Sequence, residues 1–260
     1  MGKTGHDPKQ EEKGVQARLV GAYARRYRGS DALYYQNHWS DKLLTALEGR
    51  SSGRVLDCGC AEGILMRRAQ EKNLSVVGID LTFELLKQNP CRGKIVQADM
   101  EHLPFQRGAL DTVFVRGALH HLPSVEAALS EIWGALKRGG LLVFSEPNHD
   151  SFLLRLPRFL WYRFSSKFSH AHRAISKREI LQALQRSGYR IRKVSWFGFL
   201  AFPLCGLKDF LPVLDCLPFR LSIAKGLTAL DELISAVPIL NRQSWHLIVE
   251  AVKGDGGDGP

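Results

Sequence analysis

The sequence is poor in cysteine and lacks the patterns that export or membrane insertion would need. Its five cysteines are odd in number and irregularly spaced, so without a CxxC pair they offer no disulfide framework. The first fourteen residues are polar and contain no apolar run like that of a signal peptide. The longest uncharged run, residues 194–207, is shorter than the ~18 apolar residues of a membrane span. We therefore expect a cytoplasmic protein with no membrane-spanning segment.

The rest of the composition is that of a globular protein with one basic region. Hydrophobic residues make up 45% of the 260 residues and charged residues 24%, which excludes disordered, collagen-like and membrane-embedded chains. The net charge of +10 is local, because residues 151–200 contain 11 basic residues and a single acidic one, Glu179. A negatively charged partner would be met in that region.

The two ends of the chain are rich in glycine and polar residues, and no internal repeat is visible between them. Residues 1–14 and 254–260 have the composition of disordered tails. The length suits one large domain, which we place at residues 15–253.

Short apolar runs alternate with helical patterns through most of the chain. Runs rich in Val, Ile and Leu that end in Gly, Asp or Pro read as buried strands, and the segments between them have helical spacing. This alternation predicts an α/β fold with a doubly wound, mostly parallel sheet. The expected strands are 54–59, 74–80, 93–99, 110–117, 140–147, 189–197 and 244–253, and the expected helices are 62–72, 83–89, 125–138 and 176–188.

Two segments interrupt the alternation and predict a cap on the sheet. Residues 147–175 mix Leu, Phe, Trp and Tyr with Arg155, Arg158 and Arg163. Residues 198–241 are apolar, contain four prolines, and separate the last two strands by far more than a hairpin loop requires. We expect these segments to form a helical, apolar and basic cap inserted around the last strands.

Acidic residues end three successive strands, and the first is followed by a glycine-rich turn. Asp57 precedes the turn GCAEG at residues 59–63, and Asp80 and Asp99 end the next two strands. The carboxyl ends of parallel strands meet at one edge of a sheet, where a turn that leads into a helix directs backbone N–H groups at a ligand. A carboxylate would repel a diphosphate but would attract a cation, and it can accept hydrogen bonds from ribose hydroxyls. The pattern favours a positively charged nucleoside without phosphate.

These motifs resemble the class I S-adenosylmethionine-dependent methyltransferases, in particular the type 11 group that includes ubiquinone- and menaquinone-biosynthesis enzymes. The resemblance covers about residues 40–195 and rests on VLDCGCAEG, VVGID, QADMEHLPF, LDTVFVRGALHHL and ALKRGGLLVFSEPN in this order. It implies a Rossmann-like fold and S-adenosylmethionine as cofactor. The implied cofactor-binding residues are Asp57, Gly59, Cys60, Ala61 and Gly63 for the methionine portion, Asp80 and Leu81 for the ribose, Asp99 and Met100 for the adenine, and Arg116 after the fourth strand.

The turn contains an alanine and lies beside a pair of cysteines. Ala61 stands where the family usually has a glycine, and the turn survives this change unless that residue needs a positive φ. Cys58 and Cys60 form a CxC pair with no second pair, so we expect both to pack in the interior and expect no metal site.

Three residues near the ends of the fourth and fifth strands are candidate catalytic groups. His120 and His121 follow the fourth strand, where the resemblance places the acceptor, and an imidazole with a pKa near neutrality can remove a proton from a nucleophile. Glu146 ends the fifth strand and is the second candidate for the base. The alternative is that one histidine only packs beneath the cofactor.

The composition of the cap is compatible with several classes of methyl acceptor. A basic and aromatic segment can bind single-stranded nucleic acid, anionic lipid headgroups or a phosphorylated small molecule. The neighbouring apolar segment favours a small apolar or amphiphilic acceptor over nucleic acid, together with peripheral contact to an anionic membrane. A base beside the cleft favours O-methylation. The alternatives are an RNA or protein methyltransferase that uses the basic cap, and a non-catalytic binding protein with the same fold.

Overall fold

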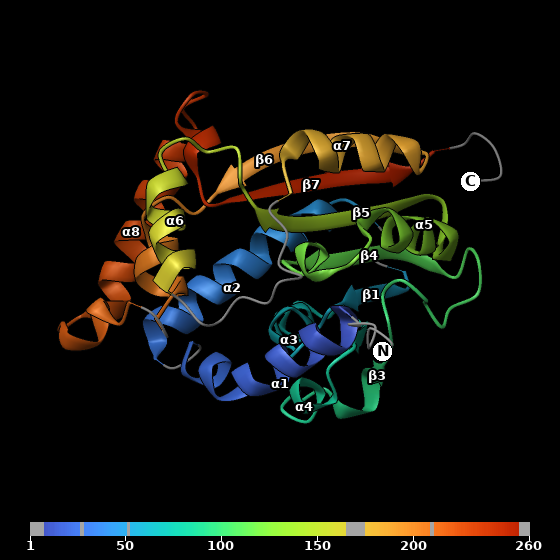
Figure 1. Ribbon diagram of the computed structural model, residues 1–260, viewed down its shortest axis with the longest axis horizontal. Helices are drawn as coiled ribbons and strands as arrows, with labels where there is room; N and C mark the ends of the chain where they lie inside the picture. Colours follow the sequence, from blue (N-terminus) through green and yellow to red (C-terminus); the bar gives the residue numbers. More distant parts are fainter. Residues whose placement is uncertain (1–7, 27–28, 51–52, 165–174, 209–210, 255–260) are drawn as a thin grey trace, which may run out of the picture.

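The chain folds around one seven-stranded sheet with helices on both faces (Figure 1). The computed structural model describes residues 8–26, 29–50, 53–164, 175–208 and 211–254. The strand order is β3-β2-β1-β4-β5-β7-β6. The strands are β1 (Val55–Cys58), β2 (Val76–Asp80), β3 (Ile95–Gln97), β4 (Leu110–Arg116), β5 (Leu136–Pro147), β6 (Tyr189–Phe197) and β7 (His246–Lys253).

The predicted doubly wound, mostly parallel sheet is confirmed. Strands β1 to β5 pair in parallel, and β7 is inserted antiparallel between β5 and β6. The chain moves outward from β1 through β2 to β3, then returns to the other side of β1 to form β4 and β5. Ligands of open α/β sheets bind at such a reversal, outside the carboxyl ends of the strands. The topology therefore places a site beyond β1 and β4.

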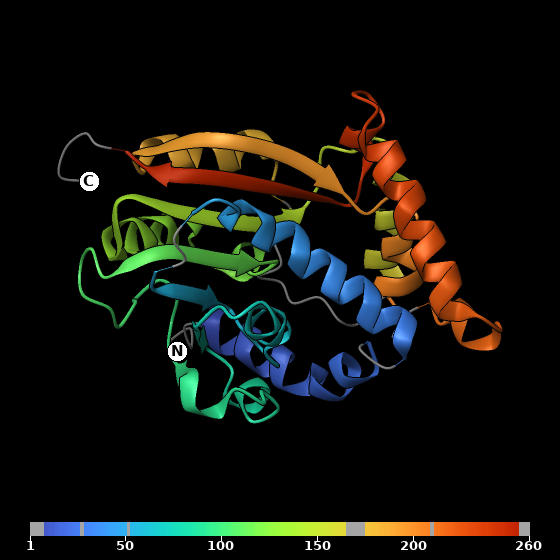
Figure 2. The same cartoon turned by 180° about the vertical axis from the view of Figure 1, so that it is seen from behind.

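Two apolar cores fill the space between the sheet and its helices. On one face lie α5 (Val125–Ala135) and α7 (Lys177–Arg186), and on the other lie α2 (Ser30–Leu44), α3 (Ile64–Glu71) and α4 (Phe83–Leu86) (Figures 1 and 2). Helix α7 begins at the predicted capping box, in which Ser176 and Glu179 satisfy each other's backbone N–H groups. The expected helix at 125–138 ends earlier, because β5 begins at Leu136.

The two predicted cap segments contain helices that lie beyond the carboxyl ends of the parallel strands. They are α6 (Arg155–Phe164) and α8 (Arg220–Ser235), which lie at the same end of the sheet (Figures 1 and 2). A third apolar cluster, which includes Tyr35, Phe202 and Trp245, joins α8 and Leu154, the residue before α6, to α2. Asp231 of α8 accepts hydrogen bonds from the backbone N–H groups of residues 199, 200 and 201 at 2.7 to 2.9 Å. These bonds fix the backbone that leads into the short helical segment Phe202–Gly206.

The prediction of a disordered N-terminus is wrong for residues 8–14, which form the first turns of α1 (Pro8–Arg26). Lys9 forms ion pairs with Asp99, at 2.6 Å, and with Glu101. Such contacts between residues 90 positions apart hold a polar segment in place and leave no periodic apolar signal in the sequence. Residues 1–7 and 255–260 lie outside the described residues, and none of the described helices is both long and apolar enough to cross a bilayer.

Candidate active site

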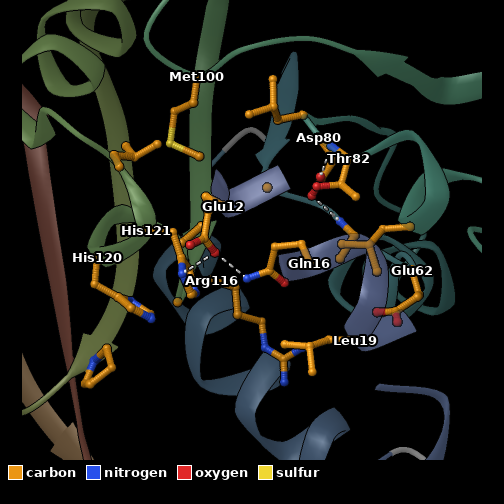
Figure 3. Close-up of a pocket in the computed structure, with 18 of the residues that line it drawn as sticks. Glu12, Gln16, Leu19, Glu62, Asp80, Thr82, Met100, Arg116, His120 and His121 are labelled. Atoms are coloured by element: carbon orange, nitrogen blue, oxygen red, sulfur yellow. Dashed lines mark hydrogen bonds and ion pairs between the residues drawn. The ribbon is translucent and has the colours of Figure 1, made fainter. Parts of the chain in front are cut away.

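A cavity of about 310 Å³ opens at the carboxyl ends of β1, β2 and β4, where the topology places a ligand (Figure 3). Its size lies at the lower end of the ~300–1,000 Å³ typical of small-molecule sites. Its walls come from α1, α2, the turn after β1, the ends of β2 and β4, the cap and the start of β7. The predicted site residues that line it are Gly59, Ala61, Asp80, Leu81, Asp99, Met100, Arg116, His120 and His121.

The glycine-rich turn is held against β2 by its own backbone. The N–H groups of Gly59 and Cys60 donate to the carbonyl of Ile79 at 2.8 and 2.9 Å. Ala61 has φ +42° and Gly63 has φ +78°, so the alanine that replaces the expected glycine occupies a conformation in which a side chain costs about 1–2 kcal/mol. The turn therefore survives at Ala61 with strain. Gly63 and Cys60 are buried in the turn and do not line the cavity.

We expect Gly63→Ala to lower the free energy of unfolding by about 1–3 kcal/mol. A Cβ atom there would lie 2.4 Å from Oδ1 of the buried Asn89, whose amide donates to the carbonyl of Ala61. The matched variant Ala61→Gly relieves strain but gains unfolded-state entropy, so its stability should stay within about 1 kcal/mol of the parent. Urea unfolding measures both. Equal stability of the two variants would contradict the assigned turn geometry.

Asp80 anchors the turn from the end of β2. Its two carboxylate oxygens accept hydrogen bonds from the backbone N–H groups of Thr82, at 2.8 Å, and Ala61, at 3.0 Å. Burial raises its pKa. Asp80 also lines the cavity, so the carboxylate that fixes the backbone of the turn is also within reach of a ligand in the cavity.

Asp57 lies beneath the turn and outside the cavity wall. Its side chain is 1% exposed, and one of its oxygens has no hydrogen-bond partner among the described residues. Burial raises the pKa of Asp57 to about 7; the Arg116 charge opposes the shift and the Asp80 charge adds to it. Asp57 therefore does not line the cavity, and its contact with the methionine portion stays a prediction.

Helix α1 closes the cavity over the end that the resemblance assigns to the adenine. Asp99 accepts hydrogen bonds from Lys9, at 2.6 Å, and from the backbone N–H of Glu101, at 2.9 Å. Lys9, Glu12, Lys13, Gln16 and Leu19 all line the cavity from α1. Figure 3 shows Glu12, Gln16 and Leu19 along this wall, with Glu12 directed at His121.

His120 and Glu146 form a buried pair at the edge of the cavity. Nδ1 of His120 lies 2.6 Å from Oε2 of Glu146, whose other oxygen accepts the backbone N–H of Leu119 at 2.8 Å. Only His120 lines the cavity, and Glu146 lies behind it. Burial lowers the pKa of His120 and raises that of Glu146 to about 7. An ionised Glu146 orients the imidazole so that its Nε2 lone pair serves as a base.

His121 has a different environment from its neighbour. Its Nδ1 lies 2.8 Å from Oε1 of Glu12 on α1, and its ring centroid lies 4.0 Å from that of His120. The structure therefore separates two histidines that the sequence left equivalent. His120 belongs to a His–Glu pair of the sheet edge, and His121 contacts the helix that covers the cavity.

The remaining wall is aromatic and basic, and apart from the predicted Arg116 its residues come from segments that sequence reasoning did not assign to the site. The Arg116 guanidinium lies 4.3 Å from the ring of Trp39 and donates to Gln36, both on α2. Arg158, from the basic segment of the cap, is only 6% exposed; it donates to the carbonyl of Asn148 at 2.8 Å and lines the cavity. The segment 147–175 also contains Lys167, His170 and His172, which lie outside the described residues, and the side chain of Arg163 is not described.

The acidic end of this cavity suits S-adenosylmethionine. Asp80 at the end of β2 presents acceptors for ribose hydroxyls, and Glu62, in the turn that precedes α3, presents a carboxylate for an amino group. In their ionised forms Asp57 and Asp80 place negative charge beside the turn, where a sulfonium is favoured, and a bound cation would in turn favour those ionised forms. Cys58 and Cys60 are buried free thiols in the apolar cores. In the described part of the chain, no group of three or more His, Cys, Asp or Glu side chains is arranged to hold a metal.

Comparison with known proteins gives the same result. Residues 56–144 match the family model described as a methyltransferase domain. A malonyl-[acyl-carrier protein] O-methyltransferase of Enterobacter lignolyticus is 30% identical over 184 residues, which cover 69% of this chain and 70% of that protein. A demethylmenaquinone methyltransferase of Lactiplantibacillus plantarum is 27% identical over 157 residues, covering 54% of this chain and 66% of that protein.

The fold is also shared with solved structures. A SAM-dependent methyltransferase from Thermotoga maritima superposes with a TM-score of 0.64 at 16% identity, over 92% of this chain and 99% of that one. Such low identity supports the fold, and the sequence matches supply the family. With its sheet topology, its ordered motifs and these relatives, the chain belongs to the class I S-adenosylmethionine-dependent methyltransferases, in the type 11 group.

Proposed function

We propose that this enzyme methylates a hydroxyl oxygen of a small, amphiphilic molecule, with His120 as the general base. Bound S-adenosylmethionine supplies an electrophilic methyl group on a sulfonium. The acceptor oxygen forms a bond to that methyl carbon as the carbon–sulfur bond breaks, and the hydroxyl proton moves to Nε2 of His120. The products are a methyl ether and S-adenosylhomocysteine.

The observation that carries this proposal is the 2.6 Å contact between His120 and the buried Glu146, with His120 on the cavity wall. A carboxylate at Nδ1 leaves the Nε2 lone pair of the imidazole free and stabilises the imidazolium that forms on proton transfer, which opposes the lowering of the His120 pKa by burial. A carboxylate acceptor is already ionised and needs no such base, whereas a hydroxyl does. The Enterobacter relative is named an O-methyltransferase, which supports oxygen as the acceptor atom.

A second acceptor class is a quinol ring, because the Lactiplantibacillus relative is named a demethylmenaquinone methyltransferase. A reduced ring must lose a proton when it attacks through carbon, so His120 could serve there too. The aromatic wall formed by Trp39, Phe202 and Trp245 accommodates a flat ring. Mass spectrometry of the isolated methylated product would separate attachment to oxygen from attachment to carbon.

The test is transfer of a labelled methyl group into cell extracts that have been fractionated into lipid, small-molecule, RNA and protein pools. We expect the label in a lipid or small-molecule pool, stable to alkali, and absent with His120→Ala. Alkali-labile label released as methanol would identify a carboxylate acceptor and refute hydroxyl methylation. Label in RNA or protein would favour that rival class, and no label in any pool would favour a non-catalytic binding protein.

We propose further that the cytoplasmic enzyme contacts anionic membranes through the outer face of α6 and the residues before it. Phe152, Leu156 and Phe159 are 63%, 66% and 63% exposed, and the exposed Arg155 lies among them. Arg158, on the same helix, lines the cavity. An apolar face with a basic residue suits the boundary between water and anionic lipid, and it would let an amphiphilic acceptor enter from the bilayer.

Replacing Phe152 and Phe159 with serine should reduce binding to vesicles that contain phosphatidylglycerol at least tenfold, because full burial of each aromatic side chain contributes ~1.5–3 kcal/mol and partial insertion contributes a fraction of it. Co-sedimentation at low and high salt, with neutral phosphatidylcholine vesicles alongside, measures the effect. The matched control is Phe83→Ser with Val96→Ser, two exposed apolar residues of α4 and of the edge strand β3, elements that lie away from α6 (Figure 1). Equal and negligible sedimentation of the parent with both kinds of vesicle would refute the membrane contact.

A further inference from the structure

A second pocket lies at the end of the sheet opposite the active-site cavity. Strand β7 connects the two, because His246 at its start lines the cavity and Lys253 at its end lines the pocket. At ~3.3 Å per residue the ends of this strand are roughly 20 Å apart. Figure 1 shows the end of β7 on the side of the molecule away from α6 and α8. The residues that line the pocket are Arg50, Gly139, Arg190, Arg192, Val252, Lys253 and Gly254.

The side chains of this pocket are strongly basic. Three arginines and one lysine line it, and none of the described residues that line it is acidic. Carboxylates on the adjoining strands pair with other lysines. Asp111 of β4 lies 2.6 Å from Lys137. Glu250 of β7 lies 3.8 Å from Lys193. Within the described part of the chain, no ion pair joins a carboxylate to any of the four cations of the pocket.

Backbone carbonyl groups hold two of the four cations in place. A guanidinium nitrogen of Arg50 donates to the carbonyl of Gly139 at 3.2 Å. Nζ of Lys253 donates to the carbonyl of Leu136 at 2.7 Å, and it lies 3.9 Å from the ring centroid of Trp133. Because these partners are uncharged, they orient the two cations without cancelling their positive charge.

The other two cations come from an irregularity in the edge strand of the sheet. β6 is the last strand, and its pairing with β7 shifts register between Ile191 and Lys193. Two steps along β6 there oppose one step along β7, so Arg192 is the extra residue of a β-bulge. Bulges of this kind redirect a side chain at the edge of a sheet. Arg190 and Arg192, both exposed, line the pocket together.

Further arginines add to the positive potential of the pocket. Burial lowers the pKa of Lys253, and the charges of Arg107 and Arg138 lower it in addition. Neighbouring cations depress the pKa of an ammonium group because they disfavour its charged form, and the same potential attracts anions. Arg190 and Arg192 also belong to the basic region 151–200 of the sequence. Part of that charge excess therefore lies at this pocket, far from the active site.

We propose that this pocket binds the phosphate or diphosphate group of a small, soluble molecule. The planar fork of arginine matches phosphate oxygens, and four cations suit a group with two or more negative charges better than a single carboxylate. Among the described residues of the pocket none is aromatic, and the apolar Val252 is buried. The pocket therefore offers no surface for stacking bases and no apolar side chain to insert into a bilayer. The site is separate from the proposed acceptor and does not depend on it.

Binding of inorganic pyrophosphate and phosphate to the full chain tests the site without any methyl transfer. The enzyme is saturated with S-adenosylhomocysteine, the ionic strength is constant, and acetate is the singly charged control. Calorimetry follows binding. We expect pyrophosphate to bind saturably and about tenfold or more tightly than acetate, because its charge and its oxygens engage several of the cations. The comparison of pyrophosphate with phosphate identifies which group the pocket prefers.

The variants separate a built site from general attraction to a basic protein. Arg190→Gln and Arg192→Gln should each weaken pyrophosphate binding by about tenfold, the loss of a hydrogen bond between charged groups. Arg192→Lys keeps the charge without the fork and should recover part of the affinity. The matched control is Arg178→Gln, an exposed arginine of α7 outside the pocket, which should leave pyrophosphate affinity unchanged. Unchanged affinity for S-adenosylhomocysteine confirms that each variant is folded.

The acidic residues that follow the pocket in the sequence need their own variant. Asp255 and Asp258 come directly after Gly254 and lie outside the described residues. Replacing both with asparagine should leave pyrophosphate binding and its dependence on Arg190 in place. Pyrophosphate binding that appears only in this variant would assign the pocket to carboxylates of the chain itself and would refute the phosphate site.

Other results would also overturn the inference. Equal affinity for pyrophosphate and acetate, or pyrophosphate binding that survives both Arg190→Gln and Arg192→Gln, would show that the pocket is not a phosphate site. Co-sedimentation with phosphatidylglycerol vesicles that falls in Arg190→Gln would assign the pocket to a membrane. A single-stranded oligonucleotide that binds more tightly than pyrophosphate, and depends on Arg190, would assign it to nucleic acid.

Discussion

Replacing His120 with alanine is expected to lower turnover by about 10² or more and to leave the affinity for S-adenosylmethionine unchanged. The imidazole is oriented by Glu146 at 2.6 Å and reaches the cavity, whereas its contacts with the sheet edge do not involve the turn after β1. Removing it therefore removes the proton acceptor and spares the cofactor side. Steady-state turnover and calorimetry with the cofactor measure the two quantities separately.

The neighbouring histidine is the matched control for this variant. His121→Ala removes an imidazole of the same loop that contacts Glu12 of α1 at 2.8 Å. It should change turnover less than tenfold and should act mainly through closure of α1 over the cofactor. A large loss of turnover in His121→Ala with near-normal turnover in His120→Ala would exchange the assigned roles.

The same pair predicts the pH dependence of turnover. Burial raises the pKa of Glu146 to about 7. Below that pH a protonated Glu146 donates to Nδ1 of His120, so the neutral ring carries its proton on Nε2 and cannot act as a base there. Above it, the ionised carboxylate accepts the Nδ1 proton and Nε2 becomes free to accept another. Turnover should rise with pH through about 7, and Glu146→Gln should lower turnover and flatten that rise.

The sheet and the cofactor side could be predicted from the sequence because their signals are local. Buried parallel strands are short runs of Val, Ile and Leu, and their ends place Asp80 and Asp99 at one edge whatever the helices do. The acidic strand ends and the turn therefore located one side of the cavity. The sequence did not show whether Ala61 has a positive φ, because the conformation of the turn depends on its tertiary contacts. In the structure its φ is +42°.

The acceptor side could not be predicted, because it depends on contacts between distant segments. Helix α1 is polar and is held by pairs such as Lys9 with Asp99, which no periodic pattern reveals. Trp39 and Trp245 meet through Phe202 only after the cap has folded onto α2. The sequence lists Arg158 beside Arg155 and Arg163 in one basic segment but does not show that Arg158 is buried, since a charge pattern carries no information on burial. The sequence does show aromatic residues near Arg158, but it does not show which of these side chains face inward.

Asp80→Ala is expected to weaken binding of S-adenosylmethionine and S-adenosylhomocysteine by about 10- to 100-fold, from the ~1.5–3 kcal/mol of hydrogen bonds to a charged group. The substitution removes the ribose acceptor and also leaves the backbone N–H groups of Ala61 and Thr82 without the carboxylate that fixes them. Both losses affect the ligand side of the turn. Asp80→Asn keeps one carbonyl oxygen as an acceptor, so its loss of affinity should be smaller.

The burial of Asp80 also predicts how its removal affects the stability of the protein. Because burial raises the pKa of Asp80, the ionised group is disfavoured in the folded protein, and its removal should reduce the free energy of unfolding less than it reduces the free energy of cofactor binding. Asp111→Ala is the matched control, since Asp111 also accepts a backbone N–H, that of Arg54 at 2.8 Å, but at the opposite end of β4 from the cavity. It should leave cofactor affinity unchanged. Calorimetry and urea unfolding of the three variants decide the matter, and unchanged cofactor affinity in Asp80→Ala would show that this carboxylate does not bind the ribose.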